Sequence, residues 1–475
     1  MREVQIHPIP LARLVELLAP DRSRRLESYA ERAHRVLRGR TVWNINATAQ
    51  GGGVAEMLQA LLAYGRGAGV DTRWLVLTAD PEFFTITKRL HNLLHGSAGD
   101  GGRLGPDERM SYQAVLQSNL EMASSLVKPG DIVLLHDPQT AGMVDGLQKQ
   151  GALVIWRCHI GADTSNEFSD IGWGFLRELI EPADGFIFSR AAYAPAWVPR
   201  SELAIIPPSL DPFSAKNLWL SGTDVEAALR EAALVDLRPG DGTLRFTRRD
   251  GSSGLVRPHR NLLIGGETVP AHARVVMQVS RWDRLKDMTG VMSGFAENVR
   301  QVPDDVHLML VGPDVSGVSD DPEGAEVLDA CISLRSKLPA EVRDRTHLCC
   351  LPMDDVDENA HLVNALQRYA SVVVQKSLVE GFGLTVTEPM WKARPVVAST
   401  VGGIKDQIVD GVSGLLLPDP TDVDAMMRAV SRFLDDPAFA TAVGAAAQER
   451  VRDRFLGDRH LIQYVDLFDS LIAGT

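Results

Sequence analysis

Two carboxylates stand in one short stretch that also carries two glycines. The segment Ser377–Met390 reads SLVEGFGLTVTEPM, and it places Glu380 and Glu388 on either side of a Gly-Phe-Gly turn, with a helix expected to begin near Leu384 or Thr385. Carboxylate oxygens accept hydrogen bonds from sugar hydroxyls, and backbone N–H groups at a helix start bind phosphate. A sugar nucleotide meets both demands, so this stretch predicts a sugar-nucleotide site.

The two acids differ in how strongly they point to a ligand. Glu388 is expected about one turn into the helix, where an acid also stabilises the helix dipole without any ligand. Glu380 precedes the helix and has no such structural role. Gly381 and Gly383, on either side of Phe382, would let the loop turn sharply and bring its amides close to a ligand.

A pair of cations follows an expected strand in the same half of the chain. Arg281 and Lys286 lie in VSRWDRLKD, directly after the apolar run Ala273–Ser280. Arginine offers a planar fork of donors and lysine a point charge, a combination that suits a diphosphate. Solvated surface charge is the usual alternative for these residue types, and the position at a strand end favours the binding site.

Polar residues also close two apolar runs in the first half. His136 and Asp137 end the first run, and His159, followed by Asp163, ends the next. A single histidine is more often a satisfied core residue than a ligand. Two histidines at matching ends of neighbouring strands favour a site instead, because the carboxyl ends of parallel strands meet at one edge.

A glycine-rich turn follows the first apolar run of the chain. Gly51, Gly52 and Gly53 precede an amphipathic helix and would let backbone N–H groups approach a phosphate or a sugar. The pattern is not GxGxxG, and it is not a P-loop because no lysine follows it. A tight turn without a ligand is the alternative.

Short β-branched runs alternate with helical patterns in both halves. This alternation predicts an α/β fold with parallel sheets covered on both faces, arranged as two Rossmann-like domains that face each other across a central cleft. The expected strands are Thr41–Asn46, Thr72–Thr78, Asp131–His136, Ala152–His159, Gly185–Ser189 and Glu202–Pro212, then Ala273–Ser280, His307–Gly312, His347–Pro352, Ser371–Gln375 and Pro395–Ser399.

The pattern divides the chain into four parts. Residues 1–212 form the first domain and residues 272–455 the second. Between them, residues 213–271 read as an irregular insertion with a hairpin near 244–256, where turn-forming residues separate two strand-like pieces. Residues 456–475 read as a terminal amphipathic helix that packs back on the first domain.

Composition excludes several classes of protein. The chain has 475 residues and a formal net charge of −13, which argues against nonspecific nucleic-acid binding. No run approaches the ~18 apolar residues of a membrane span, and the N-terminus lacks the features of a secretion signal. The four cysteines lack zinc-ligand spacing and suit reduced thiols in a cytoplasmic protein.

The motifs together resemble a known family. Glu380-Gly381-Phe382-Gly383 with Glu388 resembles the E-x7-E motif of retaining GT-B glycosyltransferases of the family-four type. GGGVAEMLQALL, HDPQ, WRCHIG and VSRWDRLKD, spread over nearly the whole chain, are similar to the trehalose glycosyltransferring synthases. The chain departs from that pattern at Gly161, where an acidic residue is expected, and in its hairpin insertion.

The resemblance implies a reaction and a role for each candidate residue. Glucose would pass from a nucleotide-activated glucose to free glucose, reversibly and with retention, to give α,α-trehalose. The catalytic and charge-stabilising residues would be His159, Glu380, Arg281 and Lys286, the donor would also contact Gly51, Gly52, Gly53, Gly381, Phe382, Gly383, Leu384, Thr385 and Glu388, and the acceptor would contact His136, Asp137 and Asp163.

The resemblance also implies what the enzyme would bind. It implies no metal site and no tightly bound cofactor, although free Mg²⁺ could stimulate by pairing with the nucleotide. The expected partners are small molecules, with a homodimer as the expected assembly, and neither nucleic acid nor membrane. ADP-, UDP- and GDP-glucose all fit as donors.

Alternative functions use parts of the same pattern. A retaining trehalose phosphorylase, which uses glucose 1-phosphate, shares much of it. A non-catalytic sugar-nucleotide-binding protein would keep the donor contacts and lose the acceptor groups, which His136, Asp137 and His159 argue against. A glycosidase would flank its bond with two acids, and the placement of Glu380 and Glu388 on one loop and helix, beside a phosphate clamp, argues against that. A nicotinamide dehydrogenase would need GxGxxG followed by an acid about twenty residues on, and that pair is not found.

Overall fold

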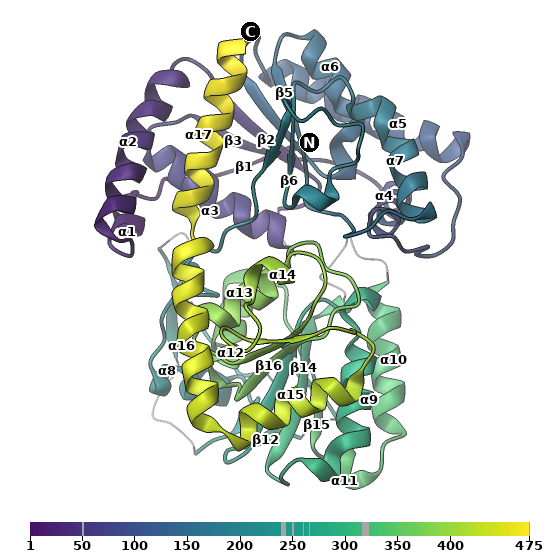
Figure 1. The fold of residues 1–475 in the computed structure, drawn as a ribbon, viewed down its shortest axis with the longest axis vertical. Coiled ribbons are helices and arrows are strands. Elements are labelled where there is room, and N and C mark those ends of the chain that lie inside the picture. The colour runs from purple at the N-terminus through teal and green to yellow at the C-terminus, as the bar shows by residue number, and fades with distance from the viewer. Residues whose placement is uncertain are drawn as a thin grey trace. The chain divides into compact units, whose positions relative to one another are not determined.

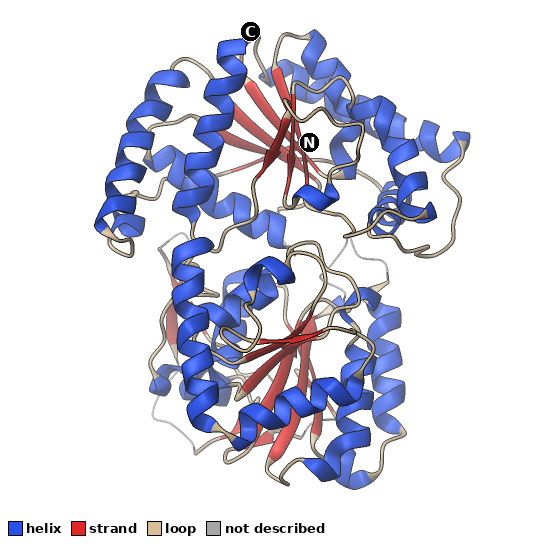
Figure 2. Ribbon diagram, viewed as in Figure 1, coloured by secondary structure: helices blue, strands red, loops and turns tan. Residues whose placement is uncertain are grey.

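The computed structural model describes residues 1–49, 52–238, 244–248, 251–259, 261–265, 267–315 and 323–474. The chain forms two compact units, one of residues 1–210 and 455–475, the other of residues 211–454. In each unit a mostly parallel sheet has helices on both faces (Figure 2). The fold is the α/β GT-B type that the sequence predicted.

Unit 1 is built on a sheet whose strand order is β1-β3-β2-β4-β5-β6-β7 in the described residues. The short β1 runs antiparallel to β3, and the other neighbours are parallel. Along the chain, β3 is added on one side of β2 and β4 on the other side. The strand order, and not the strand direction, therefore reverses between β2 and β4, and this place is the reversal point of the sheet. The strands are β1 Arg2–Val4, β2 Val42–Asn46, β3 Thr72–Val76, β4 Ile132–His136, β5 Leu153–Cys158, β6 Gly185–Phe188 and β7 Leu203–Ile205.

Helices cover both faces of this sheet, and α17 comes from the far end of the chain. Figure 1 shows α17 beside α2, and the two helices pack together. The expected terminal helix is therefore present, and it groups with unit 1. The helices are α1 Ala12–Val15, α2 Pro20–Val36, α3 Gly53–Gly67, α4 Pro81–Leu94, α5 Pro106–Leu126, α6 Val144–Lys149, α7 Glu167–Ile180 and α17 Gly457–Gly474.

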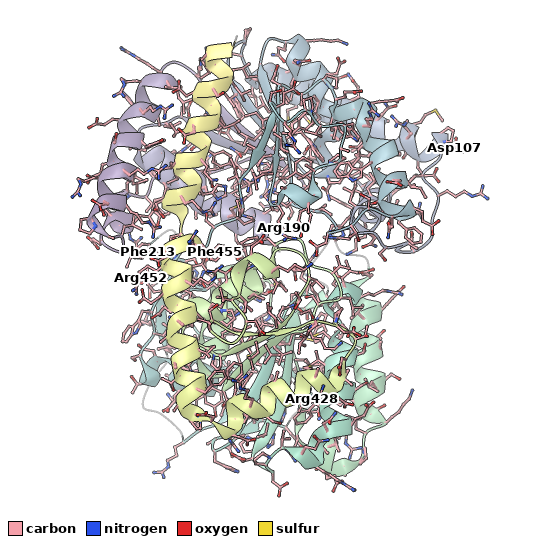
Figure 3. All side chains as sticks on the ribbon, in the orientation of Figure 1. Asp107, Arg190, Phe213, Arg428, Arg452 and Phe455 are labelled. Carbon is pink, nitrogen blue, oxygen red and sulfur yellow. The ribbon has the colours of Figure 1, made fainter. Side chains whose placement is uncertain are left out.

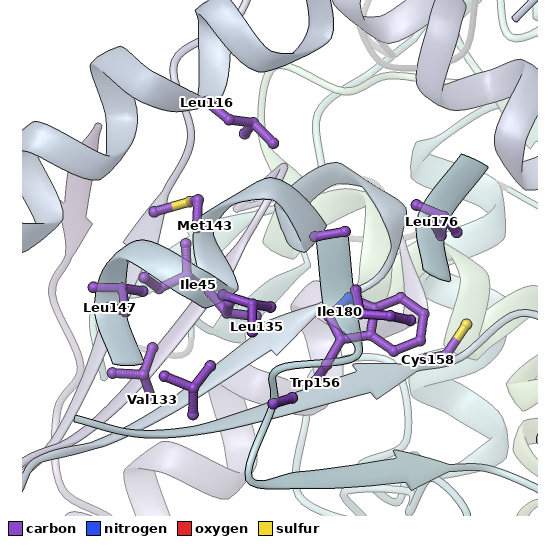
Figure 4. Close-up of a cluster of buried hydrophobic side chains, with 14 of the residues drawn as sticks. Ile45, Leu116, Val133, Leu135, Met143, Leu147, Trp156, Cys158, Leu176 and Ile180 are labelled. Atoms are coloured by element: carbon purple, nitrogen blue, oxygen red, sulfur yellow. The ribbon is translucent and has the colours of Figure 1, made fainter. Parts of the chain in front are cut away.

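Alternation along the strands divides the core of unit 1 between the two faces. Trp43 and Ile45 of β2, with Val133 and Leu135 of β4, face the α4–α7 side, where Figure 4 shows part of the cluster. The residues between them face α2, α3 and α17. On that second side lies an apolar cavity of about 80 Å³, whose wall includes Asn44, Thr72 and Tyr464.

Unit 2 repeats the plan with strand order β11-β15-β14-β13-β16-β17-β18 in the described residues. Only β11 is antiparallel to its neighbour, and the sheet reverses between β13 and β16. The strands are β11 Leu263–Ile264, β13 Arg274–Val279, β14 Val306–Pro313, β15 Thr346–Leu351, β16 Val372–Gln375, β17 Val396–Ser399 and β18 Leu415–Leu417, with β8 Val235–Asp236 and β12 Val269–Pro270 as a separate pair.

The helices of unit 2 cover its sheet and enclose a core of Val, Leu, Met and Phe side chains. They are α8 Gly222–Glu231, α9 Met288–Asn298, α10 Gly324–Ser336, α11 Ala340–Arg343, α12 Val356–Tyr369, α13 Leu384–Trp391, α14 Ile404–Gln407, α15 Val423–Asp435 and α16 Pro437–Arg454. The irregular segment that the sequence set apart, residues 213–271, lies within this unit.

The predicted hairpin is present and is fastened to α12. Strands β9, Arg245–Thr247, and β10, Ser253–Leu255, pair antiparallel. Arg248 bonds to Asp355, and the guanidinium of Arg257 and the ring of His259 both reach the buried carboxylate of Glu358. The arginines of this segment thus hold the hairpin on the helix.

Among the described residues, no helix is long and apolar enough to span a membrane.

Candidate active site

The predicted polar residues of unit 1 lie where its sheet reverses direction. His136 is the last residue of β4, and His159 follows the last residue of β5. Ligands of open α/β sheets bind beyond the carboxyl ends of the strands at such a point. The sheet topology therefore brings these two residues to the position that a ligand site requires.

The two histidine rings are in direct contact. His136 Nδ1 lies 3.2 Å from Nε2 of His159, and the ring planes differ by 8°. His136 is buried, whereas His159 is partly exposed. Desolvation, with a contribution from the charge of Arg157, lowers the pKa of both rings well below the usual range for histidine. Both rings are therefore neutral near pH 7.

Asp137 is held in a strained backbone conformation between the two strand ends. Its φ of 62° and ψ of 176° fall in a region that is essentially reserved for glycine and costs about 1–3 kcal/mol. Its carboxylate accepts a hydrogen bond of 2.7 Å from the backbone N–H of His159. Desolvation raises the pKa of Asp137 to about 7. Strain of this kind concentrates at functional sites.

Arg157 is a residue that the sequence analysis did not single out. Its side chain is fully buried and donates to Ile206 O at 3.1 Å, to His460 Nε2 at 2.9 Å and to the hydroxyl of Tyr464. In the described part of the chain no carboxylate forms an ion pair with it, and its Nε has no partner. A charge inside the apolar run LVIWRC was the sequence signal.

Asp163 and the glycine turn are less informative. Asp163 pairs with Arg190, a residue labelled in Figure 3. Gly51 lies outside the described residues. Gly52 caps α3 and Gly53 begins it, and a Cβ added at Gly52 would meet nothing within 4 Å. The surroundings therefore leave open space at this helix start.

In unit 2 the predicted residues meet at the second reversal point. The loop after β13 carries Lys286, whose Nζ donates a hydrogen bond of 2.8 Å to Oε2 of Glu380 in the loop after β16. The hydroxyl of Ser377 donates to the same oxygen at 3.1 Å. Both charged side chains are largely buried. The structure thus brings together a cation and a carboxylate that the sequence separates widely.

Buried residues that the sequence analysis missed hold these two loops together. The side-chain amide of Gln278 donates to Lys286 O at 2.7 Å and accepts from the N–H of Lys376 at 3.2 Å. Lys376 in turn pairs with Asp287, which has a left-handed backbone and caps α9. One amide and one ion pair therefore fix the position of Lys286 relative to the loop that carries Glu380.

Arg281 lies at the edge of this group. Its Nη2 is 3.7 Å from a carboxylate oxygen of the buried Asp283, and about a third of its side chain (32%) is exposed. The structure thus has both predicted cations on the loop after β13.

The Gly-Phe-Gly turn forms the start of α13. Gly383 is the N-cap with a φ of 86°, and a Cβ there would lie 3.0 Å from Cγ of Glu380. The side-chain amide of Gln407 donates to the carbonyls of Phe382 and Gly383, and Gly381 O accepts from Gly403. These contacts direct the N-terminus of α13, which begins at Leu384, along a fixed axis.

One buried hydroxyl at this helix start has no partner in the described part of the chain. It is Oγ1 of Thr385, the second residue of α13. Buried hydroxyls are nearly always hydrogen-bonded, so an orphan next to the first amides of a helix fits a site that a polar ligand completes.

Glu388 lies deeper in the helix than the simple dipole explanation requires. It is the fifth residue of α13, and no acid occurs in the first turn. Its carboxylate accepts from Gln367 at 3.1 Å and lies 3.5 Å from Nζ of Lys216. The dipole explanation for Glu388 therefore loses its basis, and Lys216 and Gln367 join the site as residues that sequence reasoning did not find.

No group of three or more His, Cys, Asp or Glu side chains with metal-ligand geometry occurs in the described residues. Among the residues that the sequence singled out, those with ionisable acidic or basic side chains at the two reversal points include the Lys286–Glu380 pair, Arg281, Glu388 and the strained Asp137.

The sequence matches two family models, "Trehalose synthase, N-terminal domain" over residues 44–195 and "Glycosyl transferases group 1" over residues 265–450. It is 34% identical to trehalose synthase of Pyrococcus horikoshii over 436 residues, which cover 92% of this chain and 91% of that protein. It is 28% identical to trehalose phosphorylase of Pleurotus sajor-caju, with 86% of this chain and 54% of that protein covered.

Among solved structures, an α,α-trehalose-phosphate synthase (UDP-forming) from Burkholderia vietnamiensis has the same fold. The TM-score is 0.66 at 17% identity, with 92% of this chain and 99% of that chain covered.

Proposed function

Because the chain belongs to the trehalose synthase family of glycosyltransferases and is a hexosyltransferase that acts in trehalose-related glucosyl transfer, we propose that it transfers glucose from a nucleotide-glucose to free glucose. The product in this proposal is α,α-trehalose, the anomeric configuration is retained, and the reaction is reversible. The observation that carries the proposal is the Lys286–Glu380 pair beside the N-terminus of α13.

Each part of that group suits one part of a nucleotide sugar. The carboxylate of Glu380 accepts hydrogen bonds from hydroxyls of the donor sugar, and Glu388 accepts those of the ribose. Lys286, Arg281 and the first amides of α13 carry the positive charge that a diphosphate requires. The hydroxyl of Thr385, which has no hydrogen-bond partner in the described part of the chain, would donate to the diphosphate as well.

The same charges assist the chemical step. As the bond between the sugar and the diphosphate breaks, negative charge grows on the leaving oxygen, and preorganised donors stabilise it more than they stabilise the ground state. The leaving diphosphate takes the proton of the attacking hydroxyl on the same face of the sugar, so the configuration is retained. Charge stabilisation comes from side chains and amides, and Mg²⁺ would act on the free nucleotide.

Unit 1 supplies groups suited to the acceptor sugar. Asp137 and the partly exposed ring of His159 lie at the carboxyl ends of β4 and β5, and both can hydrogen-bond hydroxyls. Asp163 is engaged with Arg190, so its part in acceptor binding would be to position that arginine.

The test uses the purified protein with glucose and ADP-, UDP- or GDP-glucose, and the sugars are separated by chromatography. Trehalose that forms with at least one nucleotide, and fails to form with the Glu380→Gln variant, supports the proposal. Release of the nucleoside diphosphate without trehalose would contradict it, because the acceptor would then not be glucose.

A trehalose phosphorylase is the second candidate, favoured by the relative from Pleurotus sajor-caju. A parallel tube contains trehalose and inorganic phosphate. Glucose 1-phosphate that appears only in this tube assigns the chain to the phosphorylases and excludes the nucleotide-dependent reaction.

A further inference from the structure

One face of the unit 1 sheet gathers polar side chains near its carboxyl edge. Successive residues of a strand point to opposite faces, so Asn44 of β2, His136 of β4 and Arg157 of β5 all lie on the face that α17 covers. All three side chains are nearly or fully buried, and Asn44 also lines the apolar cavity. Buried polar groups on an otherwise apolar face need partners, and here they find them in one another and in α17.

Three side chains form a continuous line of hydrogen bonds. Oδ1 of Asn44 lies 2.9 Å from Nε2 of His136, and Nδ1 of His136 lies 3.2 Å from Nε2 of His159. For Nδ1 of His159 no partner occurs in the described part of the chain. The line therefore runs from the interior of the sheet to the partly exposed residue His159 at the strand ends.

Burial, with a smaller contribution from a neighbouring charge, keeps both rings neutral. Desolvation and the guanidinium of Arg157 lower the pKa of His136 and His159, and the neighbouring His460 is held neutral in the same way. The facing acid, Asp137, has its pKa raised by burial. A neutral imidazole has one N–H and one bare nitrogen, so the state of each ring reduces to which nitrogen carries the proton.

The position of the proton follows from the line of contacts. The carbonyl oxygen of Asn44 accepts, so Nε2 of His136 carries the proton and its Nδ1 is bare. That bare nitrogen accepts from Nε2–H of His159, which leaves Nδ1 of His159 bare in turn. If the Asn44 amide were turned the other way, its N–H would donate to Nε2 of His136 and every bond of the line would reverse. The side chain of Asn44 therefore decides which nitrogen of His159 carries the proton, although the ring of His136 lies between them.

We propose that Asn44 is a positioning residue that fixes the tautomer of His159 through His136, so that Nδ1 of His159 accepts a hydrogen bond from a sugar hydroxyl. The inference rests on the proposed function for the identity of the sugar, but the tautomer itself does not depend on it. Asn44 lies inside the sheet and acts through the ring of His136. Its effect is to make the site select a hydroxyl that donates.

The first experiment measures the tautomer directly. Protein labelled with ¹⁵N at the histidine rings is examined by NMR, and His159 is assigned by its loss in His159→Gln. We expect a protonated Nε2 and a bare Nδ1 for His159 in the wild-type protein. A protonated Nδ1 would overturn the proposal, and this measurement does not require the enzyme to be active.

Variants then test the role of Asn44. Asn44→Leu removes the acceptor and should leave His159 with both tautomers populated. Thr72→Val is the matched control, because Thr72 lines the same cavity and its hydroxyl donates to Leu62 O at 2.8 Å, outside the line of contacts. The control should lose stability and keep the wild-type tautomer. An unchanged His159 spectrum in Asn44→Leu would contradict the proposal.

Kinetics with modified acceptors give a further readout. Each hydroxyl of glucose is replaced in turn by hydrogen or by fluorine, and fluorine cannot donate. At one position both analogues should lose about tenfold in kcat/KM, the size of one hydrogen bond, and this loss should shrink in Asn44→Leu and persist in Thr72→Val. If every fluoro analogue kept its activity at the positions where the deoxy analogue lost it, the role of Nδ1 as a hydrogen-bond acceptor would be overturned. A complete absence of transfer would refute the proposed function and leave the NMR result standing.

Discussion

At the scale of single residues, burial rather than charge pairing sets the ionisation of the groups in unit 1. His136, Asp137 and His159 have pKa values shifted first by desolvation, and Arg157 contributes second or third. Each of these shifts disfavours the charged form. Near pH 7 both histidine rings are therefore neutral and Asp137 is only partly ionised, which suits the binding of an uncharged sugar.

Asp137 should make stability depend on pH. Because its folded pKa is about 7, against 3.8 for an ordinary aspartate, the folded state binds more protons in this range. The contribution of Asp137 to the free energy of unfolding therefore falls as the pH rises from about 4 to 7 and is level above that. Asp137→Asn removes this term, so the Tm of the variant minus that of the wild type should increase over this interval. Parallel Tm curves from pH 5 to 8 would contradict the raised pKa.

Glu380→Gln should separate catalysis from folding only in part. The amide keeps the shape but leaves Nζ of Lys286 without its carboxylate, so we expect a stability loss of about 1–3 kcal/mol. Turnover should fall by a larger factor, on the order of 100-fold, the scale for loss of a preorganised contact to the reacting group. Thermal melts and kcat are measured together, and near-normal kcat in the variant would remove Glu380 from the donor site.

At the scale of elements, the two reversal points of the sheets explain why the sites lie where they do. The loop after β4 meets the strand end of β5 in unit 1, and the loops after β13 and β16 meet in unit 2. In unit 2 the loops are joined by the amide of Gln278, which bonds to both, by the Lys376–Asp287 ion pair and by a backbone hydrogen bond from Leu378 N–H to Leu285 O. The position of the Lys286–Glu380 contact therefore depends in part on Gln278, whose amide bonds to the backbone carbonyl of Lys286.

Gln278→Met tests that dependence. The substitution keeps the length of the side chain but leaves Lys286 O and the N–H of Lys376 unpaired, so stability should fall by about 1–3 kcal/mol and KM for the nucleotide sugar should rise. The matched control is Thr346→Val, which removes a buried hydrogen bond to Val342 O elsewhere in the same sheet. An equal KM for the two variants would show that Gln278 acts on stability alone.

The elements were largely predictable from the sequence because apolar runs and turn residues carry the information locally. All eleven expected strands are present, most to within one or two residues, and the hairpin and the helix start near Leu384 are confirmed. The three-residue edge strand β1 and the short β18 have too few residues to show a period. The structure places His136, His159 and Lys286 at or just beyond the carboxyl ends of the expected strands, and their roles in binding stay predictions.

The supporting residues of the sites were not predicted, because their partners are remote in sequence. Gln278 meets Lys376, and Lys216 meets Glu388, only after the sheet has formed. Local signals did exist for two others, since Asn44 in VWNIN and Arg157 in LVIWRC interrupt buried runs. A polar residue inside a buried strand must be satisfied, and that rule would have found both.

At the scale of the whole molecule, unit 1 is assembled from the two ends of the chain. The polar side of α17 is fixed to α2, with Arg22 on Asp458 and Arg32 on Asp466 and Asp469. Its apolar side, which includes Phe468, closes the core on the face that holds Asn44 and His136. The last helix is therefore part of the wall behind the unit 1 site.

Phe468→Ala should destabilise unit 1 selectively. Removal of a buried phenylalanine costs about 3–5 kcal/mol, and the loss should appear in the peptides of β2, β4 and α2 when hydrogen–deuterium exchange is followed by mass spectrometry. Phe433→Ala, in the core of unit 2, is the matched control and should increase exchange in that unit instead. Equal increases in both units for both variants would contradict the independence of the two cores.

The return of α17 to unit 1 has a consequence for biosynthesis. A ribosome makes residues 1–210 first, then all of residues 211–454, and only then the helix that completes the first sheet's covering. Residues 1–210 therefore remain part of a nascent chain, with the apolar face that α17 later covers still exposed, while residues 211–454 are translated and fold. Arg157 also lacks two of its partners until then, because His460 and Tyr464 belong to α17. The core of unit 2 is therefore completed before the core of unit 1, although the synthesis of unit 1 begins first.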